Sequence, residues 1–147
     1  MRGLRKFLRL PSAKRRLLVR AAFLLGTIRL GLWLLPFQTL RHLLVRLSSS
    51  SITSHDPERS SKESVVWAVE TAGRHLTRAA TCLTLALTVQ VLLLRRGYPA
   101  IVHIGAVKMD GEQFLAHAWV ESEGQAVIGG HELERYTHLA SLEGKRV

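Results

Sequence analysis

The sequence predicts an α+β fold in which several helices precede a small antiparallel sheet. Over most of the chain before Gly97, apolar residues recur at steps of three and four, which is typical of helices. After Gly97 the apolar residues alternate with polar ones, and Asp110-Gly111 and Gly129-Gly130 interrupt the alternation, as in short strands joined by turns. Helices followed by strands favour the α+β class. A length of 147 residues, 47% of them hydrophobic, fits one domain or a core with a small appendage.

Basic amphipathic helices are predicted for residues 1–47. Met1–Leu10 is a basic lead-in, and a long helix follows from Ser12, a suitable N-cap, to about Leu34. Pro36 ends this helix, since proline cannot continue it. A second helix over Gln38–Leu47 carries leucines on one face, so the pair is expected to form a helical hairpin.

The charge of the chain is uneven. Eleven of the 21 lysines and arginines lie before residue 47, whereas the first acidic residue is Asp56. Such a segment fits a membrane surface or an acidic protein, or it is simply a solvated arginine-rich face. Because the basic residues lack interleaved aromatic residues, no nucleic-acid partner is predicted.

The apolar stretch Leu17–Phe37 is not expected to span a membrane. Arg20 and Arg29 interrupt it, and an arginine near the centre of a span costs roughly 2.5–3.5 kcal/mol or more. We expect a helix that is buried against protein or lies on a membrane surface. The single cysteine, Cys82, fits a reducing compartment, so the predicted location is cytoplasmic, with peripheral membrane contact through the basic helices.

Residues 48–60 are predicted to form a Ser-rich linker, and residues 61–147 to form the core. Ser60 and Glu63 make a capping-box pattern at the start of a helix that ends near Thr77. The next helix, Cys82–Arg96, is apolar on almost every side, which predicts a central position, and Gly97 ends it.

Three strands are predicted after this helix, over Ala100–Val107, Gln113–Glu121 and Gln125–Ile128, as an antiparallel meander. Alternation places Ala118 and Val120 on one face of the second strand and His117, Trp119 and Glu121 on the other. The tail from His131 is polar, and Tyr136 and Leu139 are its expected anchors.

Cys82 and His117 are the candidate catalytic residues. A cysteine attacks a carbonyl as its thiolate, and the positive end of a helix and a nearby imidazole both favour that form. Cys82 begins a helix whose free N–H groups also suit an oxyanion, and His117 is held in the middle of a strand, where it can act as general base and acid. From the residues alone, the alternative is a buried cysteine and a core histidine in a non-catalytic binding module.

No metal or cofactor is predicted. The chain has seven histidines but no His-x-x-His or Cys-x-x-Cys spacing, and Gly129-Gly130 lacks the lysine and hydroxyl residue of a phosphate loop.

Several motifs resemble the transglutaminase-like leader peptidases of lasso peptide biosynthesis. They are Leu10-Pro11-Ser12-Ala13, Leu35-Pro36-Phe37, Ala80-Thr81-Cys82-Leu83, Arg95-Arg96-Gly97-Tyr98-Pro99-Ala100, Ala116-His117-Ala118-Trp119-Val120-Glu121 and Arg135-Tyr136-Thr137. The resemblance covers nearly the whole chain, and the Ala116–Glu121 run in register with the cysteine motif is its most specific part.

This resemblance implies a papain- or transglutaminase-like core, with the cysteine helix packed on a small antiparallel sheet and a basic helical hairpin in front of it. It implies a cysteine peptidase that cleaves the leader from a ribosomally made precursor peptide, with Cys82 as nucleophile and His117 as base. A separate leader-binding protein would present the precursor, and an ATP-dependent cyclase would close the ring. The basic N-terminal helices would dock one of these two proteins or contact the membrane. An acyltransferase on the same scaffold is a further alternative.

The third catalytic residue stays unassigned. The family commonly has an acidic residue at the end of the strand after the base, where this chain has Ile128-Gly129-Gly130. Glu121 and Glu132 are near in sequence, Asp110 is a turn residue, and a main-chain carbonyl or an amide would also serve.

Overall fold

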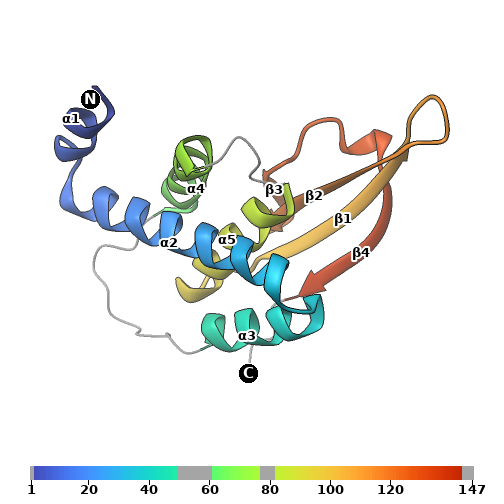
Figure 1. The fold of residues 1–147 in the computed structure, drawn as a ribbon, viewed down its shortest axis with the longest axis horizontal. Helices are drawn as coiled ribbons and strands as arrows, with labels where there is room; N and C mark the ends of the chain where they lie inside the picture. Colours follow the sequence, from blue (N-terminus) through green and yellow to red (C-terminus); the bar gives the residue numbers. More distant parts are fainter. Residues whose placement is uncertain (1, 50–60, 77–81, 144–147) are drawn as a thin grey trace.

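The computed structural model describes residues 2–49, 61–76 and 82–143 and confirms the α+β class (Figure 1). The helices are α1 (Arg2–Leu8), α2 (Ser12–Leu34), α3 (Phe37–Ser49), α4 (Lys62–Leu76) and α5 (Cys82–Arg95). The strands are β1 (Ile101–Lys108), β2 (Phe114–Ser122), β3 (Gln125–Ile128) and β4 (Thr137–Glu143), with the short 3₁₀ helix η1 (Leu133–Arg135) before β4. The predicted linker, residues 48–60, lies mostly outside the described residues.

The four strands form one antiparallel sheet in the order β3-β2-β1-β4. Figure 1 shows the helices gathered on one side of the molecule, while the β1–β2 hairpin extends away from them. α5 is central, as its sequence predicts, because it packs against α2, α3, α4 and β2. Between Thr84 and Leu93, buried residues lie on every side of the helix.

The N-terminal helices share this core. Leu17, Ala21 and Ile28 of α2 and Leu40 of α3 are buried in the same cluster as residues of α4, α5 and the sheet. Residues 1–47 thus precede the predicted core along the chain, but in space α2 and α3 contribute to its packing.

Three helix starts differ from the prediction by one residue, and one of them is α3, which begins at Phe37 instead of Gln38. Ser12 is the first helical residue of α2, and Pro11 is the N-cap, whose carbonyl accepts a hydrogen bond from the N–H of Arg15. Proline is compatible with the position because the N-cap contributes its carbonyl, and not its N–H, to the helix. In α4 the side chain of Ser61 accepts a hydrogen bond from the N–H of Ser64 at 3.2 Å, which is the capping contact expected of Ser60. Ser60 lies outside the described residues.

The predicted glycine stop of α5 is confirmed. Gly97 has a φ of +81°, and the N–H of Tyr98 reaches back to the carbonyl of Leu93 at 3.0 Å. This pattern satisfies carbonyl groups at the helix end and turns the chain into β1.

The tail forms a fourth strand that the sequence analysis did not predict. β4 pairs with β1, and the register shifts between Ile104 and Gly105. The prediction that Leu139 anchors the tail is wrong, because Leu139 is 62% exposed. Leu142 is buried in the core instead. Leu142 lies opposite the buried Val102, whereas Leu139 is the unpaired residue between Ala140, opposite Ile104, and His138, opposite Gly105.

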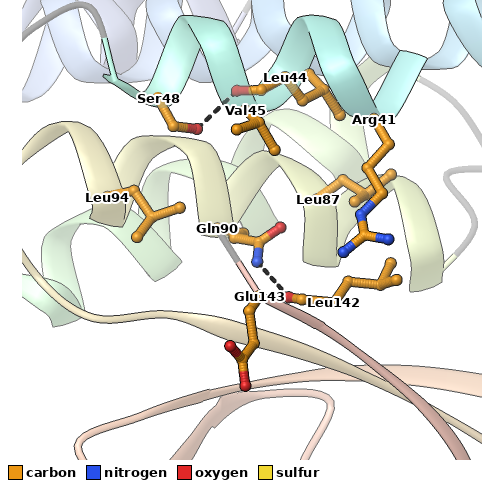
Figure 2. A pocket seen from close by; sticks show the side chains of 9 residues that line it. All are labelled: Arg41, Leu44, Val45, Ser48, Leu87, Gln90, Leu94, Leu142 and Glu143. Carbon is orange, nitrogen blue, oxygen red and sulfur yellow. Dashed lines mark hydrogen bonds between the residues drawn. The ribbon is translucent and has the colours of Figure 1, made fainter. Parts of the chain in front are cut away.

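The side chain of Gln90 in α5 is hydrogen-bonded to the main chain just before β1 and near the end of β4. Its Nε2 donates to the carbonyl of Leu142 at 2.7 Å and to the carbonyl of Ala100 at 3.2 Å. Figure 2 shows the bond to Leu142 among the residues that line a pocket between α3, α5 and the end of β4. A buried amide that satisfies two carbonyls fixes the sheet relative to α5.

Candidate active site

Cys82 is the first residue of α5. Its thiol is free and half-buried, and it packs against the edge of the hydrophobic core. The first N–H groups of a helix have no partner within the helix, so they point past this position with a partial positive charge. Figure 1 shows this end of α5 directed toward the side of the sheet formed by β2 and β3. Residues 77–81, which precede the cysteine, lie outside the described residues.

His117 lies in the middle of β2 and is half-buried. Its Nε2 is 2.7 Å from the carbonyl oxygen of Gly129, just past the end of β3. Because a carbonyl only accepts hydrogen bonds, Nε2 is the protonated nitrogen. In the neutral ring, Nδ1 is then the acceptor.

Gly129 is suited to this contact by its lack of a side chain. Its φ is +70°, a conformation that glycine adopts without strain. A Cβ atom at this position would lie 2.8 Å from the carbonyl oxygen of Ala118 and 3.3 Å from Nε2 of His117. The glycine therefore permits the close approach of its own carbonyl to the imidazole.

Two rings pack beside the imidazole. The ring centroid of Tyr136 is 4.9 Å from that of His117, and the centroid of Trp119 is 6.2 Å away. Gly105 leaves space for them, since a Cβ there would lie 3.0 Å from Trp119 and 3.0 Å from Tyr136. Tyr136 is a predicted anchor of the C-terminal tail, and in the structure its ring packs against the imidazole of His117. Gly105 lies inside a strand, and a glycine in that position is a sequence feature that indicates close packing by neighbouring groups.

No carboxylate binds His117 among the described residues. Glu121 faces a different histidine, with its Oε2 3.3 Å from Nε2 of His103. Glu132 pairs with Arg135 at 2.7 Å, and this hydrogen bond and the negative charge raise the pKa of the Arg135 guanidinium. Asp110 lies exposed in the β1–β2 turn. The hydrogen-bond partner of His117 is thus the main-chain carbonyl of Gly129 and not a carboxylate.

The two candidate catalytic residues come from elements that pack against each other. α5 contacts β2, but no hydrogen bond joins Cys82 and His117 in the described part of the chain. Ala118 and Val120 are buried in the core, so His117 and Trp119, which alternate with them, lie on the other face of the sheet. β3 pairs only with Val120–Ser122, which leaves the edge of β2 at His117 uncovered by β3.

A second polar cluster on this outer face was not predicted. Nδ1 of His103 lies 3.0 Å from Oγ of Ser141 and 3.1 Å from Nε2 of His138, and the His103 ring stacks on Trp119 at 5.5 Å. The cluster depends on the pairing of β1 with β4, which brings Ser141 opposite His103. Within the described ranges, no three His, Cys, Asp or Glu side chains are grouped so as to hold a metal ion.

Comparison with known proteins adds one finding. The sequence matches the family described as the transglutaminase-like superfamily over residues 22–141, which includes α5 and the strands from β1 into β4. No curated protein and no solved structure matches the chain.

Proposed function

Since the chain belongs to the transglutaminase-like superfamily, whose members are often cysteine-dependent enzymes, we propose that it is a cysteine peptidase. The substrate that we propose is a ribosomally made lasso peptide precursor, cleaved between leader and core. This finer assignment depends on the motifs around Cys82 and on the Ala116–Glu121 run, which resemble the leader peptidases of that pathway.

The observation that most supports an imidazole base is the bond between His117 and Gly129. With Nε2 donating to the carbonyl at 2.7 Å, the lone pair of Nδ1 is left to accept a proton. The proposal requires the thiol of Cys82 to reach this nitrogen. Because His117 lies on the face of the sheet away from α5, this contact has to form around the edge of β2 that β3 leaves uncovered.

The proposed reaction has two stages. Nδ1 of His117 takes the thiol proton, and the thiolate of Cys82 attacks the carbonyl carbon at the leader–core junction. The resulting oxyanion faces the N–H groups at the start of α5, and the imidazolium protonates the leaving amine of the core peptide. A water molecule, deprotonated by His117, then hydrolyses the thioester. This step releases the leader as a carboxylic acid and regenerates the thiol.

The proposed partners are the precursor peptide, a separate leader-binding protein and the lasso cyclase. We propose a cytoplasmic location. The leader-binding protein would present the leader–core junction to the enzyme, and the cyclase would use the released core peptide.

The first test is the pH dependence of iodoacetamide labelling at Cys82 in the folded protein. We expect fast labelling below pH 8 and slower labelling for His117→Ala, because the imidazole favours the thiolate. The control is His131→Ala, since His131 is exposed in a turn. Labelling that requires unfolding, or equal rates for all three proteins, would contradict the catalytic pair.

The second test is cleavage of the precursor peptide in the presence of its leader-binding protein, followed by mass spectrometry. Loss of His117 should lower the rate by about 10²–10⁴-fold, the usual contribution of a general base. Cys82→Ala should abolish cleavage and leave precursor binding intact. A product in which the leader carries an added amine, rather than water, would identify the acyltransferase alternative.

A further inference from the structure

Helix α2 presents a second apolar face to solvent. Its inner face is in the core, where Leu17, Ala21, Leu25 and Ile28 are at most 4% exposed. Five large apolar side chains lie on the opposite side of the same helix and form its outer stripe: Val19 (53% exposed), Phe23 (73%), Leu30 (55%), Trp33 (82%) and Leu34 (62%). They recur at steps of three, four and seven residues, so they share one side of the helix. An exposed stripe of this size usually marks an interaction surface.

Basic side chains flank the outer stripe. Arg16, Arg20 and Arg29 are exposed, and in the described part of the chain none of them has an acidic partner. The sequence has no acidic residue before Asp56, so no negative charge on α1, α2 or α3 competes for these arginines. Leu4 and Leu8 of α1, the helix that precedes α2, are exposed as well.

We propose that the outer stripe of α2 binds the surface of a membrane that contains anionic lipid, with the helix lying in the membrane plane. α2 is the described helix that is long and apolar enough to cross a membrane by length and composition. Its inner face is packed against α4 and α5, however, so only the outer stripe is free to meet lipid. The stripe enters the boundary between headgroups and acyl chains, and the arginines contact lipid phosphates.

The composition of the stripe favours lipid over an acidic protein. Val19 to Leu34 spans about 22 Å of helix at 1.5 Å per residue, and its most exposed side chain is a tryptophan. Tryptophan suits the membrane interface, where one side of the ring is apolar and the other is wet. A bilayer supplies hydrocarbon along the whole stripe and negative charge on both flanks at once, whereas a protein partner would need a matching apolar groove.

The test is flotation of the full chain with phosphatidylcholine vesicles, with and without phosphatidylglycerol. We expect binding to the anionic vesicles that weakens as salt is raised. Phe23→Ser should weaken it about tenfold, because the ring that enters the bilayer on binding is lost. The matched control is Phe114→Ser, since Phe114 is 72% exposed but lies at the far end of the β1–β2 hairpin. Arg16→Gln with Arg20→Gln should also weaken binding about tenfold or more, and Lys108→Gln should not.

Trp33 supplies a second measurement. Its emission should shift to the blue on anionic vesicles, and Trp33→Phe should remove that shift while binding persists. Lipids brominated near the headgroup should quench it more than lipids brominated deep in the chain, and an alkaline wash should release the protein. Deep quenching with resistance to the wash would overturn the in-plane arrangement.

Three other outcomes would overturn the proposal. One is equal loss of flotation for Phe23→Ser and Phe114→Ser. Another is self-association in lipid-free solution that Phe23→Ser abolishes, which would assign the stripe to a second copy of the chain. The third is binding to polyglutamate but not to vesicles, which would assign it to an acidic protein. Because neither Cys82 nor His117 is changed, the result does not depend on the proposed peptidase activity.

Discussion

The two faces of the β-sheet carry different kinds of residues, although both come from the same strands. The inner face is apolar: Val102 and Val120 are fully buried and Leu142 nearly so. The outer face holds rings and polar groups, including His103, His117 and Trp119. From His117 to Glu121 the side chains of β2 alternate between the two faces, although Trp119 on the outer face is also buried, at 8% exposed. A change on one face should therefore affect stability, and a change on the other should affect reactivity.

The largest effect is expected on the inner face. Val120→Asp would bury an unpaired carboxylate at a fully enclosed position and should cost more than about 4 kcal/mol of unfolding free energy. Leu115→Asp on the same strand is the control, because Leu115 is 49% exposed and should change stability by less than about 1 kcal/mol. Urea denaturation followed by circular dichroism measures both. Equal costs would show that the two positions are equally buried.

β4 gives a second comparison, between Leu142, which lies opposite the buried Val102, and Leu139, which is left unpaired at the register shift. Leu142→Ala should cost about 2–4 kcal/mol, because it opens a cavity under α5, whereas Leu139→Ala should stay within about 0.5 kcal/mol. The urea denaturation midpoints of the two variants, compared with that of the wild type, measure these stability losses. The reverse order would show that Leu139, and not Leu142, packs against the core.

Gly129→Ala tests the outer face through the backbone. The alanine must adopt a positive φ and also meets Ala118 and His117, so we expect a cost of about 1–3 kcal/mol and slower labelling of Cys82. Gly124→Ala is the control, since Gly124 has a φ of +81° with open space around it. It should show a strain cost without a change in labelling. If both variants label at the wild-type rate, the carbonyl of Gly129 has no role in setting the state of His117.

The smallest effect is expected for Tyr136→Leu. It removes a ring next to His117 and should cost about 1 kcal/mol. The nuclear magnetic resonance signals of the His117 ring should shift because the neighbouring ring current is lost, whereas Tyr98→Leu should leave them in place. Unshifted signals would show that Tyr136 does not pack on the imidazole in solution.

Much of the fold follows from local signals in the sequence. Pro36 and Gly97 mark helix ends because each has a fixed conformational effect, and the short strand Gln125–Ile128 between turn residues matches β3 as predicted. The alternation in β2 places Ala118 and Val120 correctly against the core. These features depend on a few neighbouring residues, which is why a single sequence predicts them.

The remaining features depend on contacts between distant residues. β4 was missed because its alternation is interrupted by the register shift opposite Ile104 and Gly105. The cluster of His103, His138 and Ser141 requires that same pairing. The packing of α2 on α4 and α5 brings together helices separated by residues 50–60, and no local pattern predicts it. Cys82 and His117 were selected from the sequence as a catalytic pair, and that assignment stays a prediction.

The partner of His117 belongs to the main chain, which has a consequence for how such proteins are compared. A carbonyl group is present at every residue, so no substitution can delete it, and residue types reveal it only indirectly, through the glycine that permits its approach. Only a change in the course of the backbone after β3 would remove the bond. A search that ranks distant relatives by whether they retain three catalytic side chains would therefore discard a chain like this one. A search for a glycine that brings its carbonyl to the histidine would retain it.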